Sequence, residues 1–210
     1  MDILAKLFGS EAKVKIMRLF LFNSDQPFSP ADIASRAKVS LPVVRHEVGI
    51  LRKMAMIKGK RFIRSVSVRR GKKTVIKRKK EGGWLLNPNF PYLPAIRNLL
   101  INTVLVKHSD IIRRLNTIGR IKLIILSGVF IQDEDSRVDL LVVGDAIRFG
   151  ALEGVIRIIE SEIGKELRYA AFETPDFKYR LGIYDKLIRD ILDYPHIKAL
   201  DRIGIFPTLG

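Results

Sequence analysis

The sequence predicts a chain of mixed α and β structure in two parts, an N-terminal α+β part and a C-terminal α/β part with a small mixed sheet. Three observations predict this organisation. Residues 1–85 carry 21 Lys and Arg against 6 Asp and Glu, whereas residues 86–210 carry 17 against 16. In the first half, helical patterns precede a basic hairpin pattern, and in the second half short apolar strands alternate with helices. Such charge asymmetry is typical of a polyanion-binding module joined to a different kind of domain.

The composition excludes several classes of protein. The 210 residues are 47% hydrophobic, which is too much for a disordered chain. Without cysteine there is no disulfide, thiolate nucleophile or cysteine-based zinc site, and the three histidines lack the spacing of a metal pair. No apolar run reaches the roughly 18 residues that span a bilayer, and the start lacks a signal-peptide pattern. We therefore expect a cytoplasmic protein with no membrane partner, and the net charge of +16 predicts a polyanionic partner.

Capping residues predict three helices before the hairpin. Ser10 precedes the first, and Ser29 followed by Pro30 begins the second, with Asp32 completing a capping box. Ser40 caps the third helix, and a tight connection at residues 38–39 separates it from the second. The expected ranges are residues 11–22, 30–37 and 41–54. The apolar side chains expected on the inner face of the third helix are Val44, Val48, Leu51 and Met54.

A basic hairpin is expected to follow. Residues 58–80 contain twelve basic residues and no acidic one, interleaved with apolar side chains that partly alternate. Gly71 lies at the middle of this segment and predicts the turn. A solvated charged run is the alternative, but such runs lack the interleaved apolar residues. Glu81-Gly82-Gly83 is expected to end the hairpin, and residues 84–86 are expected to add a short separate strand.

The order of helix, short helix, tight turn, helix and basic hairpin resembles bacterial and archaeal winged helix-turn-helix transcription regulators. The resemblance covers about residues 10–80 and includes the segment FSPADIASRAKVSLPVVRHEVGILRKMAMIK. It implies that the third helix enters the major groove of double-stranded DNA through its N-terminal residues. It also implies that the hairpin contacts phosphates or enters a minor groove. Because winged domains also bind proteins, and basic hairpins also bind RNA, both remain alternatives.

The candidate DNA contacts lie on the outer face of the third helix and along the hairpin. Arg45 is placed to read guanine or hold a phosphate, and Val43 to contact a thymine methyl group. The full set is Ser40, Pro42, Val43, Arg45, His46, Arg52, Lys53, Lys58, Lys60, Arg61, Arg64, Arg69, Arg70, Lys72, Lys73 and Lys77.

Beyond residue 85 we expect connecting helices and then an α/β domain. The predicted domains are residues 1–85, 86–118 and 119–210. Helices are expected over residues 94–107, 110–118, 147–163 and 177–192, and strands over 122–126, 138–143 and 167–172. The apolar stripe of the helix over 94–107 predicts either a core contact or a homodimer interface.

The segment LIILSGVFIQDEDSRVDLLVVGD resembles the minimal nucleotidyltransferase domain over about residues 120–172. That family carries Gly-Ser after its first strand and then Ser-Asp-x-Asp, whose two carboxylates bind the Mg²⁺ ions of a nucleoside triphosphate. Gly128, Ser136 and Asp139 match this pattern, but Val129 replaces the serine and Arg137 replaces the first Asp.

Arg137 brings a cation to a metal-ligand position, and we expect it to pair with Asp139 instead. The resemblance then implies an impaired catalytic site with no resident cofactor. The fold would serve to bind a nucleotide or other phosphate ligand, or to form a dimer.

Three functions follow from these patterns. The leading one is a DNA-binding transcription regulator. The alternatives are an active metal-dependent nucleotidyltransferase, which would use Mg²⁺ and a nucleoside triphosphate, and an RNA- or ribosome-associated protein.

Overall fold

The computed structural model describes residues 3–70, 73–102, 106–133 and 135–205, with backbone only at 66–70, 73–75 and 77. The fold is a mixture of α and β structure in two compact units. The first comprises Met1–Thr103 with Ser161–Lys165, and the second comprises Val104–Glu160 with Glu166–Gly210. Among the described residues, no helix has the length and hydropathy needed to cross a bilayer.

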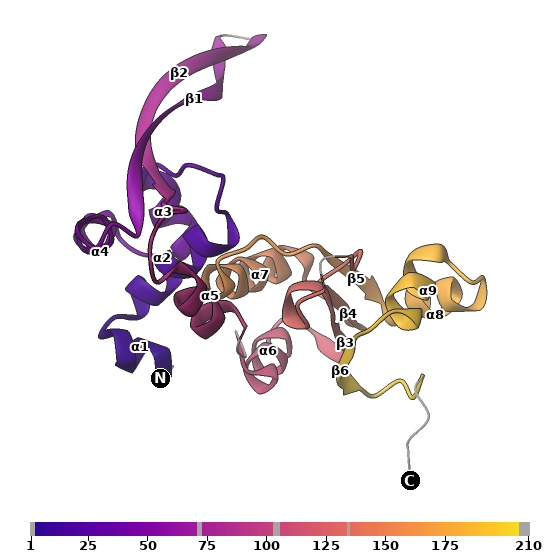
Figure 1. Cartoon of the computed structure of the whole chain (residues 1–210). Helices are drawn as coiled ribbons and strands as arrows, with labels where there is room; N and C mark the ends of the chain where they lie inside the picture. Colours follow the sequence, from indigo (N-terminus) through magenta and orange to yellow (C-terminus); the bar gives the residue numbers. More distant parts are fainter. Residues whose placement is uncertain (1–2, 71–72, 103–105, 134, 206–210) are drawn as a thin grey trace. The chain divides into compact units, whose positions relative to one another are not determined.

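The first unit combines helices with one long hairpin (Figure 1). Its elements are α1 (Ile3–Phe8), α2 (Glu11–Phe22), α3 (Pro30–Ala37), α4 (Leu41–Lys53), β1 (Ile57–Arg70), β2 (Lys73–Leu86) and α5 (Leu93–Ile101). The expected helix over 11–22 and the capping box of Ser29 and Asp32 are confirmed, and the Ser10 side chain accepts a hydrogen bond from the backbone N–H of Lys13.

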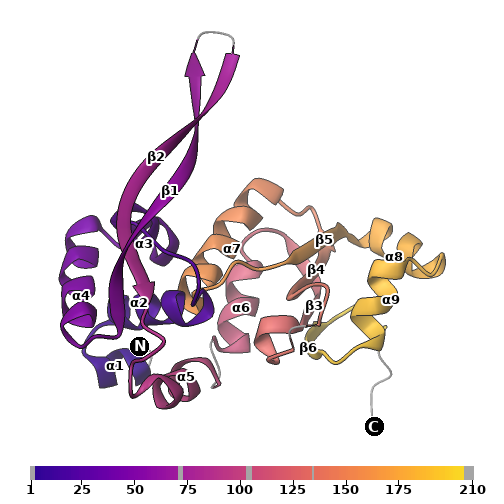
Figure 2. The same ribbon diagram turned by 45° about the horizontal axis from the view of Figure 1, so that its top comes forward.

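The core of the first unit is made by the inner faces of its helices and by the base of the hairpin. Phe20 of α2, Ile33 of α3 and Leu51 of α4 are fully buried there. Ile57 and Leu86 pair with each other at the base of the hairpin and join the same core. The hairpin is therefore anchored by burial of its first and last residues, and its remaining length projects from the unit (Figures 1 and 2).

The predicted end of the hairpin at Glu81-Gly82-Gly83 is wrong, because β2 runs without a break to Leu86. Residues 84–86 belong to this strand and do not form a separate one. Trp84 exchanges two backbone hydrogen bonds of 2.9 Å with Phe28, which precedes α3. Gly83 permits this approach, since a Cβ atom there would lie 2.2 Å from the carbonyl oxygen of Phe28.

We expect Gly83→Ala to destabilise the first unit by about 1–3 kcal/mol, because the new methyl group forces the Phe28 backbone away. Gly82→Ala is the matched control, since no atom lies within 4 Å of the position of its Cβ. Denaturant unfolding of both variants measures the difference. Equal midpoints for the two variants would contradict the close approach at Gly83.

The helix expected over 94–107 is shorter than predicted. In the structure α5 ends at Ile101, Asn102 caps it, and Lys107 already precedes the next helix; residues 103–105 lie outside the described part. Leu100 and Ile101 are buried in the core of the first unit. In the described part of this helix, the apolar stripe therefore contacts the core of the first unit. A homodimer interface on this helix stays a prediction.

The second unit contains a four-stranded mixed sheet in the order β5-β4-β3-β6. Only β4 and β5 are parallel. Its elements are α6 (His108–Leu115), β3 (Arg120–Leu126), the 3₁₀ turn η1 (Gly128–Phe130), β4 (Leu140–Asp145), α7 (Phe149–Ile163, which ends in the first unit), β5 (Tyr169–Glu173), α8 (Thr174–Gly182), α9 (Lys186–Asp193) and β6 (Ile197–Asp201). Leu123, Leu141 and Val143 of the central strands pack with Phe177 and Ile188 from α8 and α9.

Two predictions for this unit are wrong. The single helix expected over 177–192 is divided into α8 and α9, because Tyr184 adopts a left-handed backbone (φ 55°) and Asp185 caps a new helix by accepting from the N–H of Leu187. Strand β6 was not predicted. The other strands and the helix over 147–163 are confirmed, with ends that shift by at most two residues.

Candidate nucleic-acid interface

Helix α4 has one buried face and one exposed face. Val44, Val48 and Leu51 are buried, which confirms the predicted inner face, whereas Met54 follows the helix and is 47% exposed. Ser40 occupies the N-cap position with extended backbone (φ −71°, ψ 152°), but its side chain makes no capping hydrogen bond, contrary to prediction. The outward orientation of the candidate contacts on the helix is confirmed. The exposed side chains are Pro42, Val43, Arg45, His46, Arg52 and Lys53.

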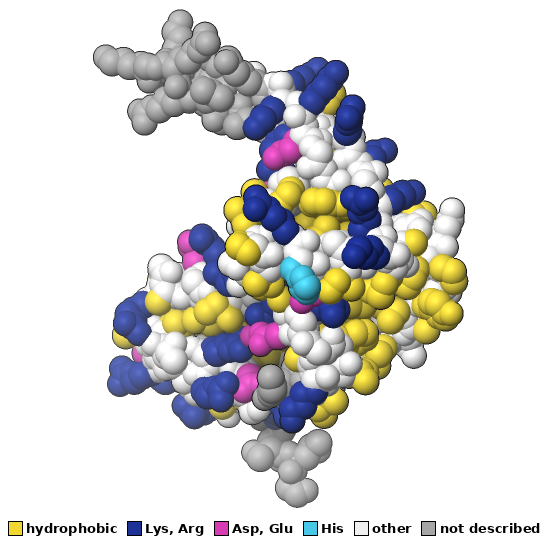
Figure 3. Space-filling model, turned by 90° about the vertical axis from the view of Figure 1, so that its left-hand side faces the viewer, with side chains coloured by type: hydrophobic (Ala, Val, Ile, Leu, Met, Phe, Trp, Pro, Cys, Tyr) yellow, Lys and Arg dark blue, Asp and Glu magenta, His cyan; other side chains and the backbone are white. Residues whose placement is uncertain are grey.

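The hairpin adds a second basic surface to the same unit. Strands β1 and β2 pair in continuous antiparallel register from Ile57↔Leu86 to Arg70↔Lys73. Figure 3 shows Lys and Arg side chains on both sides of its described part. We call six exposed side chains the ribbon cations: Lys58, Lys60, Arg61, Arg78, Lys79 and Lys80.

Three of the ribbon cations were absent from the predicted contacts, namely Arg78, Lys79 and Lys80. The signal was present, since they continue the basic run. The side chains of the predicted contacts Arg69, Arg70, Lys73 and Lys77, and the whole of Lys72, lie outside the described part of the structure.

Arg64 differs from the other predicted contacts because the protein itself holds its side chain. Its guanidinium pairs with Asp32 of α3, and its Nε lies 3.2 Å from Glu81 Oε2. Arg64 also lies over the Phe62 ring, 5.6 Å from the centroid. The hydrogen bond and charge of Asp32 raise the pKa of Arg64. Arg64 therefore acts here as an anchor of the hairpin on α3.

The same contacts shift the pKa of the Asp32 carboxyl. Burial alone raises this pKa, but hydrogen bonds from Arg64 and from the Ser29 hydroxyl and N–H more than offset burial, and the pKa lies below its ordinary value. A carboxyl with a lower pKa in the folded state stabilises the fold above its unfolded pKa of about 3.9. That stabilisation is lost as the pH falls through the lower folded value.

We expect Asp32→Asn to lower the free energy of unfolding of the first unit at pH 6, with the gap from wild type closing below a pH of about 4. Urea unfolding of wild type and variant over this pH range measures the difference in their free energies of unfolding. Asp25→Asn, at an exposed position, serves as the control. A gap at pH 6 no larger than the control's would contradict the role of Asp32.

In the second unit, Asp139 organises the loop between β3 and β4. It is fully buried and accepts hydrogen bonds from the N–H of Val129 (2.9 Å) and of Arg168 (2.8 Å). The Arg168 guanidinium adds an ion pair, with Nε 3.3 Å from Asp139 Oδ2. Gly128 is required beside it, since its backbone is left-handed (φ 54°) and a Cβ would lie 2.0 Å from Asp139 Oδ1.

The predicted pairing of Arg137 with Asp139 is wrong. Arg137 Nε lies 2.5 Å from Asp190 Oδ2 of α9, because Arg168 already occupies the Asp139 carboxylate. The buried Ser136 hydroxyl donates to Asp133 Oδ2 over 2.7 Å. The motif residues Gly128 and Asp139 are therefore in contact, while Ser136 and Arg137 point to other partners.

The residues present do not fit the pair of divalent ions that the nucleotidyltransferase resemblance implies. Such a pair needs several carboxylates, and both oxygens of Asp139 are engaged by Val129 and Arg168. Glu173, at the end of β5, accepts from the N–H groups of Ala146 and Ile147. No cluster of three or more His, Asp or Glu able to hold a metal occurs in the described ranges.

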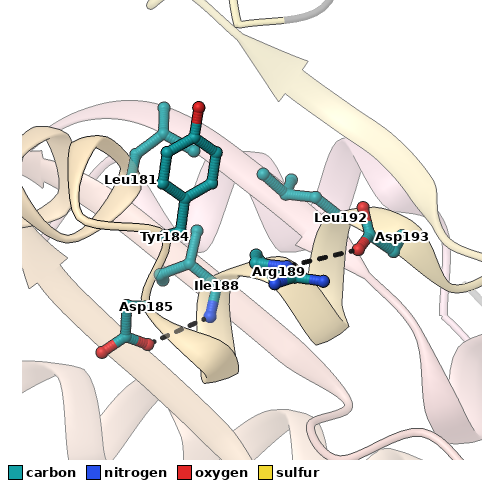
Figure 4. A pocket seen from close by; sticks show the side chains of 7 residues that line it. All are labelled: Leu181, Tyr184, Asp185, Ile188, Arg189, Leu192 and Asp193. Carbon is teal, nitrogen blue, oxygen red and sulfur yellow. Dashed lines mark hydrogen bonds and ion pairs between the residues drawn. The ribbon is translucent and has the colours of Figure 1, made fainter.

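Two cavities lie in the second unit. One of about 540 Å³ is lined by Ser127, Ser136, Arg137, Lys186 and Asp190, among others. The other, of about 390 Å³, follows the break between α8 and α9 (Figure 4). It is lined by Leu181, Tyr184, Asp185, Ile188, Arg189, Leu192 and Asp193. The lining of the first cavity combines two cations, the two carboxylates Asp135 and Asp190 and two serine hydroxyl groups, and the second cavity is mostly apolar.

No protein-family model, curated protein or solved structure matches this chain.

Proposed function

We propose that the chain is a double-stranded-DNA-binding transcription regulator whose first unit is a winged helix-turn-helix. In this proposal α3 and α4 form the helix-turn-helix and the hairpin is the wing. The second unit is a nucleotidyltransferase-like domain without catalytic function, which serves for ligand binding or dimerisation. The observation that carries the proposal is the pairing, in one unit, of the exposed face of α4 with a projecting hairpin that bears the six ribbon cations.

The dimensions and charges of these two surfaces favour duplex DNA. A major groove about 12 Å wide admits one helix, and the N-terminal turns of a recognition helix contact the bases. Arg45 and His46 are exposed in that part of α4. In the described part of the chain, no carboxylate pairs with a ribbon cation, so these charges are available to phosphates.

The test is a competition between duplex DNA and structured RNA, each from a random-sequence pool, for binding to the full chain. Preference for the duplex supports the proposal, and preference for RNA overturns it in favour of an RNA-associated function. Arg45→Ala should cost about 1–3 kcal/mol in binding if Arg45 reads a base. The matched control is Lys178→Ala, which removes one exposed charge from α8.

A phosphate ligand is a second candidate function, for the second unit. It is favoured by the cavity of about 540 Å³, where Lys186 and Arg137, the latter also paired with Asp190, lie beside Ser127 and Ser136. We expect ATP without metal to raise the melting temperature of the chain, and Arg137→Ala to abolish the rise. An equal rise with the variant would show that the ligand binds elsewhere.

The enzyme alternative is tested separately. Incubation with Mg²⁺ or Mn²⁺ and labelled nucleoside triphosphates detects nucleotidyl transfer. Transfer that Asp139→Asn abolishes would overturn the non-catalytic role, whereas absence of transfer agrees with the ion pair between Asp139 and Arg168.

A further inference from the structure

Arg64 gives the hairpin a second point of attachment to the helices of the first unit. The first attachment is at the base, where Ile57 and Leu86 are buried in the core and Trp84 bonds to Phe28. Arg64 lies further along β1, about 22–24 Å from Ile57 at about 3.2–3.4 Å per residue. The hairpin passes α3 and continues beyond it (Figures 1 and 2). Because an isolated two-stranded hairpin is only marginally stable, attachment at two levels fixes its direction better than attachment at the base alone.

Two carboxylates from different elements meet at the Arg64 guanidinium. Asp32 belongs to α3, and its carboxylate also accepts hydrogen bonds from the N–H (2.9 Å) and the hydroxyl (2.7 Å) of Ser29. The capping box therefore holds Asp32 in place at the start of α3. Glu81 belongs to β2, and its Oε2 lies 3.2 Å from Arg64 Nε, so it holds the guanidinium from within the hairpin. The three side chains are partly buried, which makes this attachment stronger than a fully exposed ion pair.

This attachment lies at the level of half of the ribbon cations. Arg64 is paired with Lys79 across the hairpin, and Arg78 and Lys80 are the neighbours of Lys79 on β2. Helices α3 and α4 pack in the same core. The direction that Arg64 gives the hairpin therefore decides where these three cations point relative to the exposed face of α4.

By charge alone, Asp32 and Glu81 should oppose the binding of a polyanion. A carboxylate beside a DNA-binding surface repels phosphates, so neutralising it ordinarily raises the affinity. A carboxylate that holds a cationic hairpin in the right direction has the opposite effect, because it makes phosphate contacts possible. The two effects differ in sign, and an affinity measurement separates them.

We propose that Asp32 and Glu81 promote DNA binding as positioning residues, by holding Arg64 so that the hairpin and α4 meet the same duplex. This inference rests on the proposed DNA-binding function. It gives Arg64 the role of a tie between the hairpin and α3, in place of the predicted role as a DNA contact.

Neutralising the two carboxylates in the full chain tests the inference. The variant D32N/E81Q and the control E11Q/D25N lose the same number of negative charges, and the control positions are exposed and outside the hairpin. E81Q alone is a second variant, because it leaves the capping box of α3 untouched. Fluorescence anisotropy of a labelled duplex at several salt concentrations measures the affinity. The emission of Trp84, the only tryptophan, reports whether the base of the hairpin stays in place.

We expect the control to bind duplex DNA as tightly as wild type or more tightly. D32N/E81Q should bind about tenfold more weakly, with a salt slope smaller by about 1–3, since fewer phosphates are neutralised. E81Q alone should weaken binding by about threefold. Trp84 emission should be the same in wild type and in all variants.

The direction of the hairpin is measured separately, without DNA. Because the chain has no cysteine, spin labels can be attached through Ser35→Cys on α3 and Ile76→Cys on β2, both at exposed positions. The distribution of distances between the two labels should be broader in D32N/E81Q than in the control.

If wild type binds duplex DNA and D32N/E81Q binds as tightly as the control, the positioning role is overturned and the proposed function stays intact. An unchanged distance distribution would also overturn the positioning role, because a loss of affinity would then have another cause. If D32N/E81Q does not fold, the same two criteria apply to E81Q. Failure of wild type to bind any duplex would instead overturn the proposed function, and this inference with it.

Discussion

Replacing all six ribbon cations with glutamine should lower the affinity for duplex DNA by about 1,000-fold or more at about 100 mM salt. The reason is counterion release, since each phosphate neutralised by a Lys or Arg frees condensed cations from the DNA. The six side chains are exposed and have no carboxylate partner in the described part of the chain. Fluorescence anisotropy of a labelled duplex measures the change.

The loss of DNA affinity is informative only if the variant without the six ribbon cations keeps its fold. Ile57, Leu86 and the bridge between Phe28 and Trp84 anchor the hairpin without any of the six. We therefore expect an unfolding midpoint at or above that of wild type, since like charges are removed. Loss of affinity by less than about tenfold, with the fold intact, would contradict the role given to the hairpin.

Asp139→Ala should destabilise the second unit by about 3–5 kcal/mol. The substitution leaves the buried N–H groups of Val129 and Arg168 without their acceptor and removes the partner of the Arg168 guanidinium. Denaturant unfolding followed by circular dichroism measures the loss. Asp135→Ala is the control, since Asp135 is exposed in the same loop. A loss within about 0.5 kcal/mol of the control would contradict the structural role of Asp139.

Local signals predicted the first unit well because its helices begin at residues with their own capping chemistry. Ser29, Pro30 and Asp32 specify the start of α3 through contacts within four residues. The inner face of α4 followed from spacing alone. Gly83 was misinterpreted because its role depends on Phe28, more than fifty residues away in the sequence. No local pattern distinguishes a glycine that ends a strand from one that admits a neighbouring backbone.

Only part of the candidate site could be predicted, because some of its contacts join residues that are distant in the sequence. The positions of Arg45 and Lys58 on exposed surfaces follow from periodicity. The anchoring of Arg64 depends on Asp32 in another element. The partner of Arg137 is Asp190 of α9, and the sequence pattern predicted α9 and α8 as one helix. Charge partners across elements are set by tertiary packing, which a single sequence does not encode locally.

The most direct measurement of the central claim is the dissociation constant of the full chain for duplex DNA as salt rises from about 50 to 200 mM. Six phosphate contacts by the ribbon cations predict a slope of log affinity against log salt of about −5 or steeper. A slope near zero, or the same slope after the six cations are replaced, would contradict the assignment of the hairpin as a DNA-binding surface.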